Sequence, residues 1–274
     1  MVKNEKNRMV ERDSGMRELL RRFRKSLRDG ECVIGPFMKT CDPAFVEVAG
    51  YAGFDFAILD MEHGPVSVKE MENNIRAAIV SGLVPIVRVP DSSETSIGKA
   101  LDIGALGVQV PQVQNARQAR EVIQRSKFSP KGERGLCRFV RAANYSALDR
   151  YEYFERANET MVILQLEGQE AMDNLDEILE VEGIDVLFIG PYDLSQSLGI
   201  PGDVTNPRVI EQMEYIVNKA KAKGIVVGTF IDEPNSVDFW KQGGVQYFSY
   251  SVDVGIFLDA CKNIVGYLRP KEEV

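Results

Sequence analysis

The segment FDFAILDMEHGPVSVKEMENNIRAAIVSGLVPIVRVP, residues 54–90, contains the unit that decides the fold. A short apolar run at Asp55–Met61 is followed by a segment of helical period at Val68–Val80, and a second apolar run follows at Pro85–Val89. Continuous apolar runs separated by amphipathic helices are typical of parallel strands that are covered on both faces. The segment therefore predicts a strand, a crossover helix and a parallel strand.

The same alternation continues along the chain, with no Pro- or Ser-rich linker to divide it. Eight candidate strands can be counted, and eight parallel strands close into a barrel. The length of 274 residues suits one such barrel, which usually takes about 250 residues. We therefore predict the α/β class, as a single (β/α)8 TIM barrel over residues 14–274, after a loosely ordered tail at residues 1–13. The predicted strands are Val33–Met38, Asp55–Met61, Pro85–Val89, Gly107–Val110, Val162–Leu166, Val186–Ile189, Val226–Phe230 and Gln246–Tyr250.

Helix starts in this pattern carry capping chemistry. Ser67 followed by Glu70 predicts a capping box, and Asp91 followed by Glu94 has the same spacing just after the third strand, where it should cap the next helix and fix the turn before it. The predicted helices are Val68–Val80, Ala116–Ser126, Gln169–Glu180, Pro207–Ala222 and Val254–Leu268.

Charge and composition exclude several classes of partner. Lysine and arginine number 33 against 41 acidic residues, a formal net charge of −8, so nucleic acid is not expected as a partner. No apolar run reaches the roughly 18 residues of a membrane span, and no secretory segment begins the chain. The widely spaced cysteines indicate free thiols in a cytoplasmic protein without a membrane partner. The basic residues at 21–28 fall on a predicted N-terminal helix and indicate a solvated face.

Catalytic groups of such barrels come from the C-terminal ends of the strands and from the loops after them. The residues at these predicted ends include acids, one histidine and one arginine, which should meet at a single mouth. They are Asp60, Glu62, His63, Arg88, Gln112, Gln165, Glu167, Asp193, Thr229 and Ser251.

His63 is the only histidine in the chain and follows an apolar strand in LDMEHGP. Its neighbours Asp60, Glu62 and Arg88 favour a role in proton transfer. The alternative is a neutral histidine whose nitrogens are satisfied by backbone groups.

Glu167 and Asp193 follow adjacent predicted strands, so their carboxylates can meet although they are far apart in sequence. Two hard oxygen donors suit Mg2+ or Mn2+, with room left for water and for a 2-oxo carboxylate. The alternative is that both acids cap helices.

Arg88 ends the apolar strand PIVRVP, where its charge needs an anionic partner. A bidentate grip on a substrate carboxylate would meet that need. An internal salt bridge to Glu62 or Asp60 would meet it as well.

These motifs resemble those of the HpcH/HpaI family of class II, metal-dependent 2-oxo acid aldolases, such as the 4-hydroxy-2-oxoheptanedioate and 2-dehydro-3-deoxyglucarate aldolases. The resemblance covers nearly the whole chain. It rests on GFDFAILDMEHGP (53–65), PIVRVP (85–90), LDIGALGVQVPQV (101–113), GERG (132–135), LQLEGQEAMDNLDEI (164–178) and GPYDLSQSLG (190–199).

The resemblance implies a hexamer, a trimer of dimers that exchange a C-terminal helix, acting on a 2-oxo acid and an aldehyde. It implies that Glu167 and Asp193 bind a divalent ion, Mg2+, Mn2+ or Co2+, and that His63 is the acid/base group. Arg88 would hold pyruvate and its enolate, and Asp60 would orient His63. Gln165, Pro191 and Asp193 match substrate-contact or supporting positions.

The segment Lys127–Arg156 breaks the regular rhythm, and long loops in barrels are often functional. It places Arg138 and Arg141 in the interval between the fourth and fifth strands, where typical aldolases of the family carry smaller residues. We expect these arginines to lie near the mouth and to bind a second carboxylate. Otherwise they pair with nearby acids and order the loop.

Extra guanidinium groups keep a second enzymatic hypothesis open, a metal-dependent condensation of oxaloacetate with acetyl-CoA to citrate. A barrel that binds a metabolite without catalysis is the alternative from another class.

Overall fold

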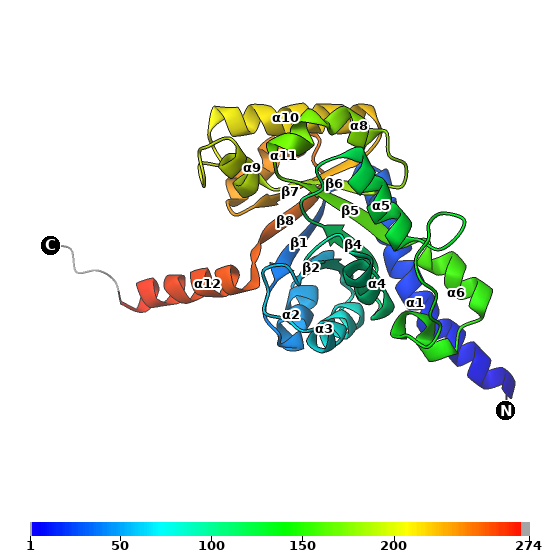
Figure 1. The fold of residues 1–274 in the computed structure, drawn as a ribbon. Helices are drawn as coiled ribbons and strands as arrows, with labels where there is room; N and C mark the ends of the chain where they lie inside the picture. The colour runs from blue at the N-terminus through cyan, green and yellow to red at the C-terminus, as the bar shows by residue number, and fades with distance from the viewer. Residues whose placement is uncertain (1, 270–274) are drawn as a thin grey trace.

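The computed structural model describes residues 2–269, and its eight parallel strands form one closed barrel in sequence order (Figure 1). Each strand pairs with the next, and β8 pairs with β1. The predicted (β/α)8 barrel is therefore confirmed, and each predicted strand is present within two residues of its expected bounds. The strands are β1 Val33–Met38, β2 Phe56–Asp60, β3 Val84–Arg88, β4 Gly107–Val110, β5 Met161–Leu166, β6 Val186–Ile189, β7 Val226–Ile231 and β8 Tyr247–Val252.

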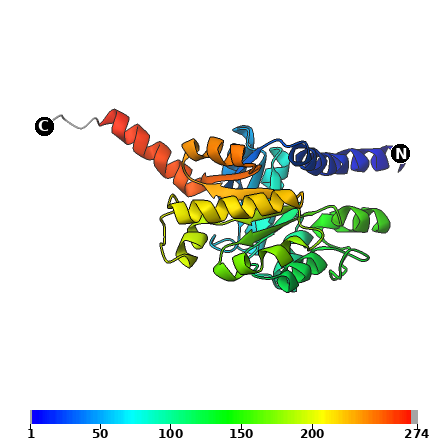
Figure 2. The same cartoon turned by 90° about the horizontal axis from the view of Figure 1, so that it is seen from above.

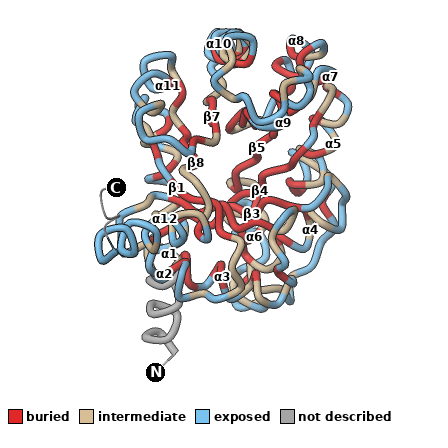
Figure 3. Tube along the Cα trace, turned by 90° about the vertical axis from the view of Figure 1, so that its left-hand side faces the viewer, coloured by how far each residue is buried: buried red, intermediate tan, exposed pale blue. Residues whose placement is uncertain are grey.

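Helices surround this barrel and cover its outer face (Figure 3). The predicted helix at 169–180 is two short helices, because the chain leaves helical geometry at Asn174. The helices are α1 Val2–Arg28, α2 Pro43–Tyr51, α3 Val68–Val80, α4 Glu94–Asp102, α5 Ala116–Ser126, α6 Arg150–Ala157, α7 Gln169–Asp173, α8 Leu175–Leu179, α9 Pro191–Ser197, α10 Pro207–Ala222, α11 Val237–Gly243 and α12 Asp253–Leu268, with 3-10 turns η1 Arg141–Ser146 and η2 Pro234–Ser236.

One of the two predicted caps forms as expected. Ser67 and Glu70 make the reciprocal hydrogen bonds of a capping box at the start of α3. The cap at Asp91 was wrong, since the N-cap of α4 is Ser93, whose hydroxyl accepts from Ser96 N. Asp91 instead accepts from Ser93 N at 2.9 Å and shapes the turn before the helix.

Helix α1 closes the N-terminal opening of the barrel. Leu20, Phe23 and Leu27 of α1 pack with the first residues of the strands, among them Phe56 and Tyr247. The rings of Phe56 and Tyr247 stack with centroids 4.1 Å apart. Because the interior is packed and plugged at this end, a substrate can enter only at the C-terminal ends of the strands.

Alternation along the strands decides which polar groups face the barrel axis. Phe56 and Ile58 belong to the interior cluster, so Asp60, two residues further along β2, has the same orientation. Asp60 is in register with Arg88 on β3, and Arg88 is in register with Gln109 on β4. These three side chains thus form a polar row at the mouth end of the core.

The long segment between α5 and β5 lies at the other end of the barrel. Helix α5 carries the chain from the mouth back to the N-terminal ends of the strands, so the connection that follows starts there. Phe128, Ala143, Tyr153 and Ala157 give this segment a small hydrophobic core of its own.

The two terminal helices project on opposite sides of the barrel (Figures 1 and 2). Helix α12 extends away from the body, and the apolar side chains Phe257, Leu258 and Val265 on it are more than half exposed. Helix α1 includes most of residues 1–13, for which a loose tail remains a prediction. No helix within residues 2–269 is long and apolar enough to cross a membrane.

Candidate active site

The centre of the mouth is an ion-pair cluster around Arg88. Its Nε and Nη2 atoms each donate to a different oxygen of Asp60 at 2.8 Å, and its Nη1 atom lies 2.9 Å from Glu62 Oε2. The guanidinium also lies over the ring of Phe37, 4.6 Å from the centroid. The expected internal salt bridges to Asp60 and Glu62 therefore both form. A second N–H on each terminal nitrogen stays available for a substrate.

Asp60 is fully buried and shapes the turn that carries His63. Its Oδ1 atom accepts from the backbone N–H groups of Glu62 at 3.0 Å and His63 at 3.3 Å. Burial by itself raises the pKa of Asp60, but the hydrogen bonds and charge of Arg88 outweigh burial, so this pKa lies below its ordinary value. Asp60 thus positions the backbone of His63, and the imidazole stands exposed at the mouth.

A chain of amides leads from β4 to Glu167. Gln109 Nε2 donates to Gln165 Oε1 at 2.6 Å, and Gln165 Nε2 donates to Glu167 Oε1. Gln109 and Gln165 are buried, so the hydrogen bonds fix their orientation. The structure thus places Gln165 directly against Glu167, and its supporting role at a metal ligand stays a prediction.

Glu167 and Asp193 come together around Gly190, as their positions after adjacent strands predict. A methyl group built on Gly190 would lie 3.2 Å from Glu167 Cγ and 3.5 Å from Asp193 Oδ2. Burial, followed by the negative charge of Asp193, raises the pKa of Glu167 to about 7. The glycine leaves a hollow between two carboxylates that repel each other.

A divalent cation fits this pair. Two carboxylates offer the hard oxygen donors that Mg2+ and Mn2+ prefer, and a cation would relieve the repulsion that raises the pKa of Glu167. Among the residues whose side chains the structure describes, no group of three or more His, Cys, Asp and Glu is placed to hold a metal. Two acids with open positions are the arrangement expected where solvent and substrate supply the remaining ligands.

The other residues predicted at the ends of the strands differ in their contacts and backbone geometry. Pro191 is buried and begins α9, whose first turn carries Asp193. Gln112 and Ser251, at the ends of β4 and β8, have φ angles of 55° and 54°. Left-handed backbone at residues other than glycine is uncommon and concentrates at functional sites. Thr229 is buried and donates to Ile189 O at 3.1 Å, which is a structural contact.

The structure does not place Arg141 at the mouth of its own barrel, contrary to expectation. Its Nη1 atom donates to Ile103 O at 3.0 Å, in the connection that precedes β4, which is the N-terminal end of the barrel. The position "between strands four and five" was misleading because α5 intervenes and reverses the direction of the chain. Arg138 is half-buried in the same segment, and no contact among the described residues joins it to Arg88 or Glu167.

Three residues of the mouth were missed in the sequence. Lys39 follows β1 and its Nζ atom lies 3.9 Å from Asp60 Oδ2, and Phe37 faces Arg88. Gln109 could have been found from the sequence, because its amide lies within the apolar strand GVQV. A buried polar residue there needs a partner, and the amide chain supplies it.

Known proteins share this architecture along nearly the whole chain. A family model described as HpcH/HpaI aldolase/citrate lyase matches residues 34–260. The 2-keto-3-deoxy-L-rhamnonate aldolase of Salmonella gallinarum (strain 287/91 / NCTC 13346) is 33% identical over 254 residues, which cover 92% of this chain and 94% of that protein.

Solved structures agree. An HpcH/HpaI aldolase/citrate lyase family protein from Burkholderia cenocepacia J2315 superimposes with a TM-score of 0.85 at 29% identity, over 90% of this chain and 98% of that one. The citrate synthase SbnG gives 0.81 at 31% identity, over 89% and 96% of the two chains. The chain therefore belongs to the HpcH/HpaI aldolase/citrate lyase family and is an enzyme of the carbon–carbon lyase class.

Proposed function

We propose that the protein is a divalent-metal-dependent aldolase that joins or separates pyruvate, as its enolate, and an aldehyde, and thus acts on 4-hydroxy-2-oxo acids. The observation that carries this proposal is the pair Glu167 and Asp193 around Gly190, next to the Arg88 cluster. A cation site beside a fixed guanidinium suits a substrate whose carboxylate and adjacent carbonyl both carry negative charge in the reaction.

The chain's own residues have distinct tasks in this proposal. Arg88, held by Asp60 and Glu62, directs its free N–H groups at the carboxylate and developing enolate oxygen of the 2-oxo acid. In cleavage, the bond beside the hydroxyl carbon breaks, its electron pair passes to the enolate, and the hydroxyl proton leaves. His63 stands exposed at the mouth and is the group we assign to accept that proton.

Glu167 and Asp193 would hold the metal, with Gln165 fixing the first of these carboxylates. Bound there, Mg2+, Mn2+ or Co2+ would act as a Lewis acid on the oxygens of the 2-oxo acid. Pro191 and Asp193 line the substrate side in this proposal, whereas the part assigned to Arg141 is withdrawn for a single chain. A contact of Arg138 with substrate remains a prediction.

The substrate class is supported by the relatives. The substrate in the name of the Salmonella enzyme, 2-keto-3-deoxy-L-rhamnonate, is a 2-oxo acid, as the proposal requires. The likeness to the citrate synthase SbnG keeps condensation of oxaloacetate with acetyl-CoA as the second candidate. Its other motive, guanidinium groups beside the mouth, is reduced to the predicted contact of Arg138, because Arg141 lies at the other end of the barrel. Named aldolases among the relatives set aside the non-catalytic alternative.

The decisive experiment separates metal, aldolase and citrate chemistry. Protein stripped of metal should not exchange the methyl protons of pyruvate for deuterium, and Mn2+ or Mg2+ should restore the exchange. Citrate formed from oxaloacetate and acetyl-CoA, without turnover of any pyruvate-derived aldol, would favour the second candidate. Full exchange in excess chelator would contradict the metal assignment.

His63 can be tested in the same assay. His63→Ala should keep the affinities for Mn2+ and pyruvate but lose aldol turnover by roughly 10^2- to 10^4-fold, the usual contribution of a positioned acid or base. Near-normal turnover would restore the structural interpretation of this histidine. Localisation in the cytoplasm and hexamer formation remain predictions from the sequence.

A further inference from the structure

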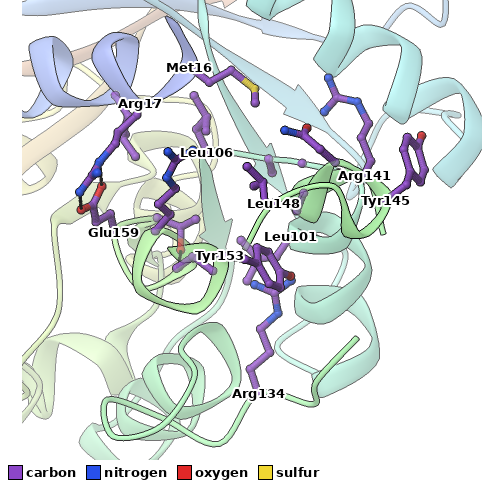
Figure 4. A pocket seen from close by; sticks show the side chains of 18 of the residues that line it. Met16, Arg17, Leu101, Leu106, Arg134, Arg141, Tyr145, Leu148, Tyr153 and Glu159 are labelled. Atoms are coloured by element: carbon purple, nitrogen blue, oxygen red, sulfur yellow. Dashed lines mark hydrogen bonds and ion pairs between the residues drawn. The ribbon is translucent and has the colours of Figure 1, made fainter. Parts of the chain in front are cut away.

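A cavity of about 270 Å³ lies at the opposite end of the barrel from the mouth. It is lined by residues of α1, of the connection between α4 and β4, and of the long segment after α5 (Figure 4). Leu106 and Thr160 in its wall immediately precede β4 and β5, which fixes its place at the N-terminal end. A ligand in this cavity would not compete directly with one at the mouth.

Arginines dominate the charge of the cavity wall. Four of them are paired with acids, Arg17 with Glu159, Arg76 with Glu72, Arg134 with Asp102 and Arg156 with Glu152. Arg141 is different, since its hydrogen bond goes to Ile103 O and no carboxylate among the described residues lies within ion-pair distance of it. Among the described residues, Arg141 is therefore the one arginine of the cavity wall without a carboxylate at ion-pair distance.

Gly104 leaves the space that the guanidinium group of Arg141 occupies. A methyl group on Gly104 would lie 2.2 Å from Arg141 Nη1, so any larger residue would displace the guanidinium. Burial, followed by the positive charge of Arg76, lowers the pKa of Arg141. An anion close to Arg141 would offset this unfavourable electrostatic environment.

Two buried donors in the cavity wall also lack partners. Tyr153 is 2% exposed, and neither its hydroxyl nor Arg134 Nε has a hydrogen-bond partner among the described residues. In Figure 4 the side chain of Arg134 rises from the long segment towards Leu101 and Tyr153. Buried donors without partners are rare in folded proteins, and a ligand that accepts hydrogen bonds is one way to satisfy them.

The rest of the wall is apolar, with Leu20, Leu101, Leu106 and Leu148 among its residues. We propose that this cavity binds a small monocarboxylate with an apolar body, its carboxylate on Arg141 and its body against these leucines. One arginine without a carboxylate partner among the described residues matches a monoanion, and leucine side chains favour a hydrocarbon over a compact inorganic ion. The site is separate from the proposed aldol site, because it lies at the other end of the barrel.

Binding of hexanoate, benzoate and inorganic phosphate should be measured by calorimetry on the full-length protein. Pyruvate is kept at saturation, so that the mouth is already occupied. Hexanoate or benzoate should bind saturably and phosphate should not. Arg141→Ala should weaken the carboxylate at least about tenfold, and Tyr153→Phe, which keeps the ring, should weaken it several-fold. Arg117→Ala, which removes an exposed arginine paired with Glu121 on α5, is the matched control.

Circular dichroism at the assay temperature shows whether each variant is folded. Arg141→Lys keeps the charge and serves if Arg141→Ala does not fold, with an intermediate affinity expected. The proposal is overturned if neither organic acid binds saturably up to about 10 mM, if phosphate binds as well as they do, or if the Arg141 variants bind like Arg117→Ala. None of these three outcomes depends on aldolase activity, so failure of this proposal leaves the proposed function unchanged.

Discussion

Arg88 and Asp60 form a two-pronged ion pair across neighbouring strands, with N–O distances of 2.8 Å for both hydrogen bonds. The pair is in register between β2 and β3 and lies where the packed interior of the barrel meets the open mouth. Asp60 is fully buried, so its carboxylate needs the positive charge of Arg88, as the carboxylate of a bound substrate would. The same guanidinium can thus hold the site together and face the substrate.

Removing one member of this pair should cost stability as well as activity. Arg88→Ala should lower the free energy of unfolding by about 3–5 kcal/mol, because a buried carboxylate is left unpaired. The double variant Asp60→Ala with Arg88→Ala should lose clearly less than the sum of the single losses. Urea denaturation checks this, and additive losses would show that the pair is not coupled.

Gly190 should be required for metal binding. Gly190→Ala places a methyl group 3.2 Å from Glu167 Cγ, which displaces that carboxylate, and should weaken Mn2+ about tenfold or more. Gly168→Ala is the matched control, since nothing lies within 4 Å of its added methyl group and its φ of −126° suits alanine. Calorimetric titration compares the two, and equal affinities would argue against the position of the site.

Metal affinity should depend on pH through Glu167. With its pKa at about 7, a cation must displace a proton from Glu167 in mildly acidic solution. The apparent affinity for Mn2+ should therefore rise close to tenfold per pH unit below pH 7 and level off above it. Titration in two buffers of different ionisation enthalpy measures the proton released. An affinity that stays flat between about pH 5.5 and 7 would place the metal elsewhere.

Lys127 should make the protein more stable in mildly alkaline solution. Its ammonium group is buried among the carbonyl groups of Asn158 and Thr160, and burial lowers its pKa to about 8. In the unfolded chain the pKa of Lys127 is near 10.5, so above pH 8 the unfolded chain binds more protons than the folded one. The cost in stability of burying the charged ammonium group is therefore full below pH 8 and is relieved as pH rises. Relative to Lys127→Met, the wild type should gain up to about 1.4 kcal/mol per pH unit between pH 8 and 10. A pH-independent difference in urea denaturation would contradict this.

Helix α12 should pack against a second copy of the chain. Phe257, Leu258, Ile264 and Val265 form an apolar stripe that the chain itself leaves exposed. Val265→Asp should reduce the mass measured by light scattering, whereas Asn263→Ser, on the side of the helix opposite this stripe, should not. A wild-type monomer at micromolar concentration would refute the predicted oligomer and its exchanged helix.

Hydrophobic period alone determined the barrel. Runs such as VLFI at β6, between segments of helical period, are typical of strands buried on both faces, and parallel strands are usually connected through a helix, so local chemistry and topology agree. The same rule placed His63, Glu167 and Asp193 at the mouth, because residues that follow strands of a closed barrel share one end.

Tertiary structure alone decided how these groups are paired and which end of the barrel a connection occupies. No spacing in the sequence distinguishes Asp60 from Glu62 as the two-pronged partner of Arg88, since that depends on register and on which side chains point inward. Arg141 was misplaced for a related reason. A segment between two strands in the sequence can lie at either end of the barrel. Here the direction of α5 places the segment with Arg141 at the N-terminal end.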